Sequence, residues 1–115
     1  MTTKEVMLRA AKALDDKKGI DIQILKIADV STLADYFLIC TGTSNTHIRA
    51  LCDAVEAAMD DAGEALISKE GHHGGTWVLL DYGSVVIHVF TDEARKFYDL
   101  ERLWNDAVPV EIGEI

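Results

Sequence analysis

One uninterrupted apolar segment, residues 36–40 (Tyr-Phe-Leu-Ile-Cys), limits the folds open to this chain more than any other feature. It lacks the alternation of apolar and polar residues that is typical of a strand with one solvated face. A continuous run of this length is instead typical of a strand that is covered on both faces. We therefore expect a sheet whose strands have other elements packed against them.

The rest of the chain predicts helices that interleave with strands. Thr2 and Glu5 form a capping box that begins a helix, and Gly19 and Gly63 follow two stretches of apolar residues at helical spacing. Gly83 and Ser84 alone separate two apolar strands, which predicts a tight antiparallel hairpin. We expect helices over about 3–18, 45–62 and from 91 onward, and strands over 21–27, 36–40, 65–70, 77–82 and 85–90. This order predicts an α/β (α+β) fold with a mixed sheet of about five strands flanked by helices.

Length and composition indicate one acidic globular domain. The chain has 115 residues and a formal net charge of −9, from 20 acidic and 11 basic residues. We expect a single domain over residues 1–106 and a C-terminal tail over 107–115, whose lack of a clear pattern is compatible with disorder. The net charge disfavours extensive contact with a phosphate backbone. It fits either a basic protein partner or a role in solubility alone, and the composition leaves both open.

The expected cellular setting follows from what the sequence lacks. No apolar run approaches the roughly 20 residues that cross a membrane, and the N-terminus has no apolar core of a signal peptide. The two cysteines, Cys40 and Cys52, lie in apolar surroundings and are typical of small core residues rather than of a disulfide framework. We therefore expect a cytoplasmic protein with no membrane partner.

Candidate catalytic and ligand-binding patterns are weak. The turn that starts at Gly42 stands between a strand and a helix, where phosphate loops occur, but it has one glycine and no following lysine, so it is better interpreted as a helix cap. The only Asp-x-Glu, Asp99 and Glu101, falls in a helical region rather than on a strand, where magnesium-binding acids of a nucleotidyltransferase would lie. No two histidines have a standard metal-ligand spacing, and no Gly-x-Ser-x-Gly motif occurs. We assign no catalytic, cofactor-binding or metal-binding residue.

The segment 97–104 is the strongest candidate for an interaction site. It holds three aromatic residues, two acids and one arginine within eight positions, and tryptophan, tyrosine and arginine are the residues that most often anchor interfaces. On one continuous helix, Phe97, Leu100 and Trp104 would share a face, and Tyr98 and Arg102 would share another. The segment could therefore pin the helix to the sheet and bind a partner. Asp99 and Glu101 could either face a basic partner or serve as a cap and a local ion pair.

A second candidate lies in the hairpin. Trp77 and Asp81 are four positions apart on one strand, so their side chains lie on the same face of the sheet. An acid directly before a tight turn can cap that turn through its carboxylate. The alternative is that Asp81 extends an acidic docking surface. The residues alone leave both interpretations open.

Three segments together resemble the Iojap family, the ribosomal silencing factors. They are residues 34–45, which end in Thr-Gly-Thr-Ser-Asn, residues 77–90, which form the Trp-to-Phe hairpin, and residues 97–104. The resemblance covers about residues 5–106. It implies a fold like that of nucleotidyltransferases without their catalytic acids, and a non-enzymatic protein that has no cofactor.

The resemblance also implies a partner and a mechanism. The partner is the large ribosomal subunit, bound through its L-fourteen protein, and the bound factor sterically blocks the small subunit and so represses translation. A homodimer of the free protein is implied as well. An assembly factor of the large subunit and a nucleotide-binding enzyme remain alternatives. Matching the motif positions carries the partner-binding role to Trp77, Asp81, Tyr98, Asp99, Leu100, Glu101 and Trp104.

Overall fold

The computed structural model of the chain describes residues 2–104 and 108–110, and the predicted succession of helices and strands is confirmed up to residue 98. The elements, in chain order, are α1 (Thr3–Asp16), β1 (Ile20–Lys26), β2 (Tyr36–Thr41), α2 (Asn45–Asp61), β3 (Ser68–His72), a 3-10 turn η1 (His73–Gly75), β4 (Trp77–Asp81), β5 (Val85–Phe90), α3 (Asp92–Tyr98), α4 (Leu100–Leu103) and β6 (Val108–Val110).

Side-chain caps explain where the helices begin. The hydroxyl of Thr2 accepts a hydrogen bond from the backbone N–H of Glu5 at 3.2 Å, so Thr2 caps α1 as predicted. The Glu5 carboxylate accepts from the Thr2 hydroxyl, and not from the Thr2 backbone N–H as in a complete capping box. The Ser44 hydroxyl accepts from the N–H of His47 at 3.1 Å and starts α2. Thr91 caps α3 in the same way. Each cap satisfies a backbone donor that the first helical turn leaves unpaired.

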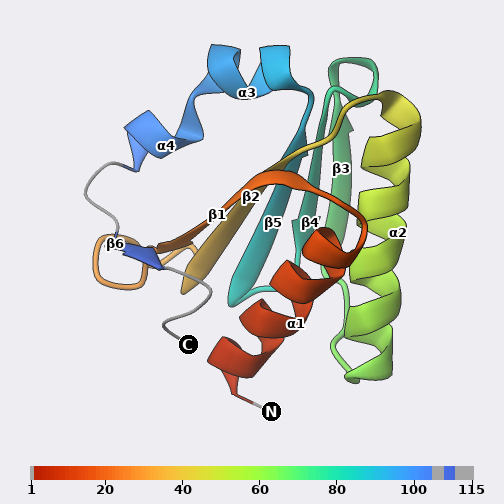
Figure 1. Ribbon diagram of the computed structural model, residues 1–115. Helices are drawn as coiled ribbons and strands as arrows, with labels where there is room; N and C mark the ends of the chain where they lie inside the picture. The colour runs from red at the N-terminus through yellow and green to blue at the C-terminus, as the bar shows by residue number, and fades with distance from the viewer. Residues whose placement is uncertain (1, 105–107, 111–115) are drawn as a thin grey trace.

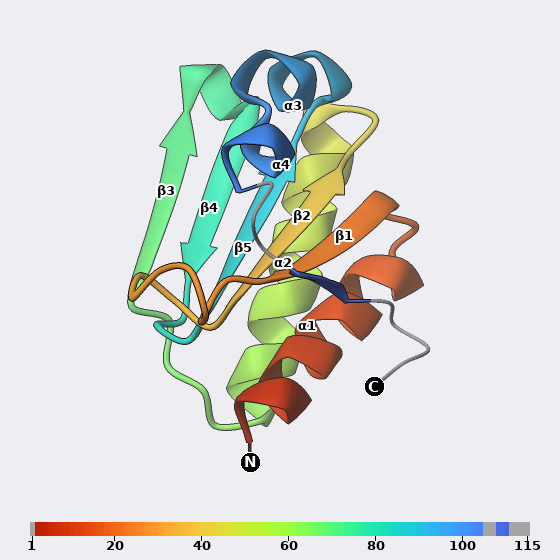
Figure 2. The same cartoon turned by 90° about the vertical axis from the view of Figure 1, so that its left-hand side faces the viewer.

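The strands form one mixed sheet in the order β3-β4-β5-β2-β1-β6. Only β2 and β5 run parallel, and every other neighbouring pair is antiparallel. The two helices α1 and α2 lie side by side on one face of the sheet (Figure 1). The short helices α3 and α4 lie on the other face, over one end of the strands (Figure 2). The central position of β2 accounts for the apolar run that its sequence shows.

Alternation along the strands creates two cores. Leu38 and Cys40 of β2 belong to the core under α1 and α2, whereas Phe37 and Ile39 belong to the core on the opposite face. All four side chains are buried, so the prediction that this strand is covered on both faces is confirmed. The second core is the smaller one, and four large side chains at its border remain only partly buried: Trp77, Leu79, Tyr98 and Trp104.

The C-terminal part of the chain differs from the expectation in strand number. We expected about five strands and no regular structure after residue 106, but Val108–Val110 form a sixth strand that pairs with β1. Three residues around a proline give no recognisable strand pattern, and the pairing depends on the edge that β1 offers. Pro109 is tolerated there because an edge strand needs fewer backbone donors. Residues 107 and 111–115 of the expected tail, like the domain boundary at residue 106, lie outside the described residues.

The last helix also differs from the expectation, because Asp99 interrupts it. Its φ of 48° and ψ of 55° place it in the left-handed region, between α3 and α4. The change of direction separates residues that one helix would have aligned. Phe97 is 80% exposed, whereas Leu100 is buried. The interpretation that Phe97 and Leu100 pack together against the sheet is therefore wrong for Phe97.

Candidate partner-binding face

The sheet face opposite α1 and α2 brings together side chains from distant parts of the sequence. We define the aromatic face as Phe37 of β2, Trp77 and Leu79 of β4, His88 of β5, Tyr98 of α3 and Trp104 after α4. Figure 2 looks onto this side of the sheet, where α3 and α4 cover only one end of the strands. Three of the predicted partner-binding residues, Trp77, Tyr98 and Trp104, thus lie on one surface.

Ring contacts connect these residues across the strands. The centroids of the Trp77 and Tyr98 rings are 4.6 Å apart, and Trp77 stacks on Phe90 at 5.1 Å. On the other side, Phe37 meets Trp104 edge to face at 5.4 Å. Aromatic pairs at such separations add stability beyond their buried area. The tryptophans therefore have two roles here, because each packs against the core and still exposes part of its ring.

His88 lies between the two groups of rings. Its Nδ1 accepts a hydrogen bond from the indole N–H of Trp77 at 3.2 Å, and its ring is 4.9 Å from that of Phe37. Since an indole can only donate, Nδ1 carries no proton and the neutral ring is protonated at Nε2. That second nitrogen is buried and has no hydrogen-bond partner among the described residues. Burial lowers the pKa of His88 to about 4.

Asp81 lies at the other end of β4 and closes the hairpin. Its Oδ1 accepts a hydrogen bond from the backbone N–H of Gly83 at 2.7 Å, which is the turn-capping interaction expected of an acid at this position. By strand alternation Asp81 is on the same side of the sheet as Trp77 and Leu79. The carboxylate is half-buried, so the turn contact does not hide it from a partner.

The segment 99–101 serves the fold as well as the surface. Asp99 is the left-handed residue between two helices, and no side-chain hydrogen bond caps α4 from it. Leu100 is buried in the second core. Glu101 lies 3.4 Å from the Nε of Arg95, an ion pair without hydrogen-bond alignment. Among the three, the half-buried side chains of Asp99 and Glu101 remain accessible in part.

Arg95 is a structural residue that sequence reasoning missed. Its side chain is 7% exposed, and one guanidinium nitrogen donates to the carbonyl of Asp21 at 2.8 Å and to the hydroxyl of Thr41 at 2.9 Å. A second nitrogen lies 3.5 Å from the Asp21 carboxylate. Arg95 therefore connects α3 and α4 to the ends of β1 and β2. A basic residue in a helix pattern indicates exposure, so no local signal could have revealed this burial.

The turn at Gly42 is a structural cap. The Nδ1 of His47 accepts a hydrogen bond from the backbone N–H of Thr43 at 2.9 Å. Its Nε2 donates to the carbonyl of Lys17 at 2.9 Å, at the C-terminal end of α1. Together with the Ser44 cap, these bonds agree with the helix-cap interpretation. Gly42 itself is required because a Cβ atom there would lie 2.6 Å from a side-chain carbon of Ile48.

The described residues offer little for catalysis or metal binding. Within residues 2–104 and 108–110, no group of three or more His, Cys, Asp or Glu residues could hold a metal ion. Cys40 and Cys52 are free and buried, and burial raises the pKa of their thiols to about 12 and about 11. Such thiols stay protonated near neutral pH and are poor nucleophiles. No helix in the described part of the chain has both the length and the apolar character to cross a membrane.

A mixed sheet with two helices on one face and a partly open aromatic face on the other defines an α/β protein whose clearest feature is a surface rather than a catalytic cleft. Comparison with known proteins identifies the family to which the chain belongs. The family model described as "Ribosomal silencing factor during starvation" matches residues 1–115. The chain belongs to the ribosomal silencing factor family, which associates it with the ribosome and with the regulation of translation.

Individual relatives agree with that assignment. The chain is 41% identical over 107 residues to "Ribosomal silencing factor RsfS" of Bacillus subtilis, covering 93% of this chain and 91% of the relative. A crystal structure of a Chromobacterium violaceum protein superposes with a TM-score of 0.88 at 38% identity, covering 91% of this chain and 88% of the other. A mouse protein named "Mitochondrial assembly of ribosomal large subunit protein 1" is 31% identical over 95 residues, covering 80% of this chain and 42% of the mouse protein.

Proposed function

We propose that this protein binds the large ribosomal subunit through the L-fourteen protein and blocks association with the small subunit by steric occlusion. Occupying the joining surface represses translation without making or breaking a covalent bond, so the protein acts as a cytoplasmic regulator and not as an enzyme. The proposal combines the family membership with one observation. Three half-buried aromatic side chains, Trp77, Tyr98 and Trp104, converge on a sheet face that the helices leave partly open.

The physical character of the aromatic face supports a protein partner. Tryptophan and tyrosine supply large contact areas at a small cost in conformational entropy, and they dominate the binding energy of many interfaces. The exposed side chain of Phe97 contacts Tyr98 edge to face and enlarges the apolar area. Asp99 and Glu101 lie within three residues of Tyr98 in the chain, whereas Asp81 lies at the other end of β4 from Trp77. An apolar surface in a protein of net charge −9, with half-buried acids near one part of it, fits a partner that presents an apolar contact beside basic residues.

A second candidate is assembly of the large subunit. The printed name of the mouse relative describes such a role for that protein. The same face could bind an immature particle and protect a site until maturation ends. The two functions differ in the particle that is bound, because an assembly factor prefers precursors and a silencing factor binds the mature subunit.

Co-sedimentation of the full chain with purified mature subunits tests the proposal. We expect binding to large subunits, no binding to small subunits, and a loss of joined ribosomes when both subunits are mixed with the protein. Equal sedimentation with both subunits would contradict the proposal. Preferential recovery with precursor particles, with no effect on joining, would favour the assembly role. Sedimentation of the free protein tests the implied homodimer.

A pair of tyrosine variants localises the binding face. Tyr98 is half-buried on the aromatic face, and Tyr36 is half-buried beside the core under α1 and α2. Tyr98→Ala should weaken large-subunit binding by at least about tenfold, since central aromatic anchors often carry about 2 kcal/mol or more. Tyr36→Ala removes the same side chain on the other face and should leave the affinity unchanged. Equal affinities for the two variants would exclude the aromatic face.

A further inference from the structure

His88 is the one polar residue of a strand that is otherwise apolar. The strand β5 has the sequence Val-Val-Ile-His-Val-Phe, and all six residues are buried. The ring of His88 lies on the side of the aromatic face, where it is near the rings of Phe37 and Phe90, and the residue is only 4% exposed. An apolar residue there would avoid the cost of burying two ring nitrogen atoms. The histidine therefore requires an explanation other than packing.

The hydrogen bonding of this ring involves Trp77. The two residues lie on the paired strands β4 and β5, and Nδ1 of His88 accepts from the indole N–H of Trp77 at 3.2 Å. The buried Nε2 has no hydrogen-bond partner among the described residues. A buried nitrogen without a partner lowers stability, so its presence in a native fold requires a compensating benefit. The hydrogen bond to Trp77 is what distinguishes His88 from an apolar residue of similar size.

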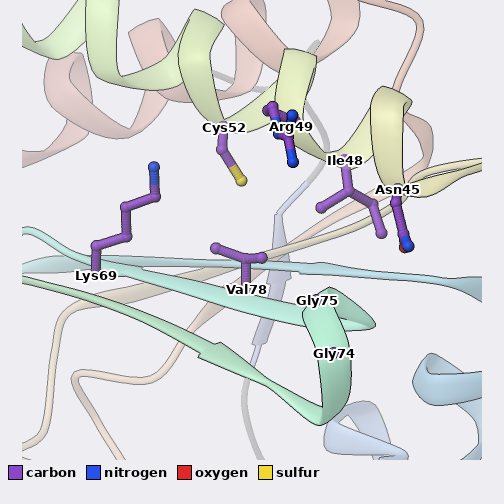
Figure 3. A pocket seen from close by; sticks show the side chains of 8 residues that line it. All are labelled: Asn45, Ile48, Arg49, Cys52, Lys69, Gly74, Gly75 and Val78. Atoms are coloured by element: carbon purple, nitrogen blue, oxygen red, sulfur yellow. The ribbon is translucent and has the colours of Figure 1, made fainter.

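Trp77 lies on a face where no long helix holds its side chain. Figure 3 shows Val78, the next residue of β4, pointing across a small cavity toward α2 on the opposite side of the sheet. On its own side, Trp77 is half-buried and packs against the rings of Phe90 and Tyr98. Contacts between flat rings restrain the plane of an indole more than its rotation within that plane. A hydrogen bond is directional, so the contact with His88 fixes that rotation.

We propose that His88 is a positioning residue of the aromatic face, which holds the indole of Trp77 in the orientation that meets the large-subunit partner. This role rests on the proposed function, because it acts through a residue of the proposed binding face. Fixing the ring before binding reduces the conformational entropy that association would otherwise cost. Since the indole N–H is engaged within the protein, Trp77 offers ring carbon atoms to the partner. The partner should therefore present an apolar group at this point rather than a hydrogen-bond acceptor.

The affinity of the full chain for purified large subunits tests this role. His88→Phe removes the acceptor and keeps an aromatic ring, so it should weaken binding about fivefold, which corresponds to the loss of one neutral hydrogen bond. The variant should melt no lower than the parent at neutral pH, because the unpaired Nε2 is removed as well. His88→Gln keeps an acceptor and should restore the parental affinity. Ile39→Val, beside His88 in the same core, is the control for a change in packing and should bind like the parent.

Two further measurements separate positioning from packing. The indole N–H signal of Trp77 in NMR spectra should exchange with solvent faster in His88→Phe than in the parent, whereas the signal of Trp104, the other tryptophan, should not change. In a Trp77→Phe background, His88→Phe should change the affinity by less than about twofold, because the residue through which it acts is absent. A role in packing alone would give the same loss in both backgrounds.

The outcomes distinguish this inference from the proposed function. Failure of the parent chain to bind large subunits would contradict the proposed function, and the role of His88 with it. Binding by the parent together with an unchanged affinity in His88→Phe would overturn the role of His88 alone. An equal loss with and without the indole of Trp77 would do the same. If His88→Phe does not fold, the smaller His88→Leu removes the same acceptor and has the same expected results.

Discussion

His88 shows how one buried side chain makes the fold sensitive to acid. Its Nδ1 is engaged by Trp77, and its Nε2 is buried without a partner among the described residues, so the protonated ring would be poorly solvated. The folded-state pKa of about 4 lies below the ordinary value of 6.5. The unfolded chain therefore binds a proton more readily, and the contribution of His88 to stability is complete above pH 6.5 and declines as the pH falls toward 4.

The variant His88→Gln should have a shallower loss of stability in acid. The difference of about 2.5 pKa units corresponds to about 3 kcal/mol, which the parent should lose between pH 6.5 and 4 in addition to losses from other groups. Glutamine can still accept from Trp77 and does not titrate. Urea unfolding of both proteins at several pH values measures the two slopes. Equal dependence of the unfolding free energy on pH in both proteins would show that His88 does not contribute to the loss of stability in acid.

Substitutions of Asp99 separate the effect of its backbone conformation on stability from the effect of its charge. A left-handed residue costs about 1–2 kcal/mol when its side chain has a Cβ, and Asp and Asn tolerate this region better than branched residues do. With φ at 48°, Asp99→Val should lower the free energy of unfolding by about 1–2 kcal/mol. Asp99→Asn should be nearly neutral, although it removes the same charge. Equal losses in both variants would indicate that the carboxylate, and not the backbone, matters at this position.

The helices α3 and α4 depend on one buried arginine for their position. Arg95 donates to the Asp21 carbonyl and the Thr41 hydroxyl and pairs with Glu101. Seven and four residues are too few for helices to be stable alone, so their packing must come from such contacts. Since Tyr98 and Trp104 are carried by these elements, the aromatic face depends on Arg95 without containing it.

Arg95→Met should therefore destabilise the fold by about 2–4 kcal/mol, because buried oxygen atoms lose a charged donor. Arg102→Met, at an exposed position of α4, serves as the control and should change the unfolding free energy by less than about 0.5 kcal/mol. Denaturant unfolding gives both values. If Arg95→Met unfolds like the control, then the core contacts of Leu100 hold these helices by themselves.

The whole molecule carries a charge that should influence how it finds its partner. A net charge of −9 accelerates the encounter with a basic surface and is screened by salt, with a Debye length of about 8 Å at physiological ionic strength. Raising the salt concentration should then slow association with large subunits more than it speeds dissociation. Stopped-flow or surface-binding kinetics at several ionic strengths measure both rates. A salt-independent association rate would mean that the charge serves solubility alone.

Local patterns were sufficient for most of the architecture. The helix cap at Thr2, the helix start at Ser44 and the hairpin at Gly83 each depend on contacts within a few residues, and all three are present. The apolar run of β2 likewise predicted burial on both faces. Successive side chains of a strand point to opposite faces, so a strand that is covered on both sides has apolar residues at consecutive positions. These features could be predicted because the residues that determine them are neighbours in the chain.

Long-range contacts determined the remainder. Nothing local distinguishes Arg95 from an exposed helical arginine, and its partners Asp21 and Thr41 lie more than 50 residues away. The short strand β6 exists through pairing with β1, and the break at Asp99 turns Phe97 toward solvent. The candidate surface was thus predicted in part. Trp77, Tyr98 and Trp104 stood out by residue type, but their meeting with Phe37 and His88 required the sheet order, since side chains from four segments become neighbours only when those strands and helices pack.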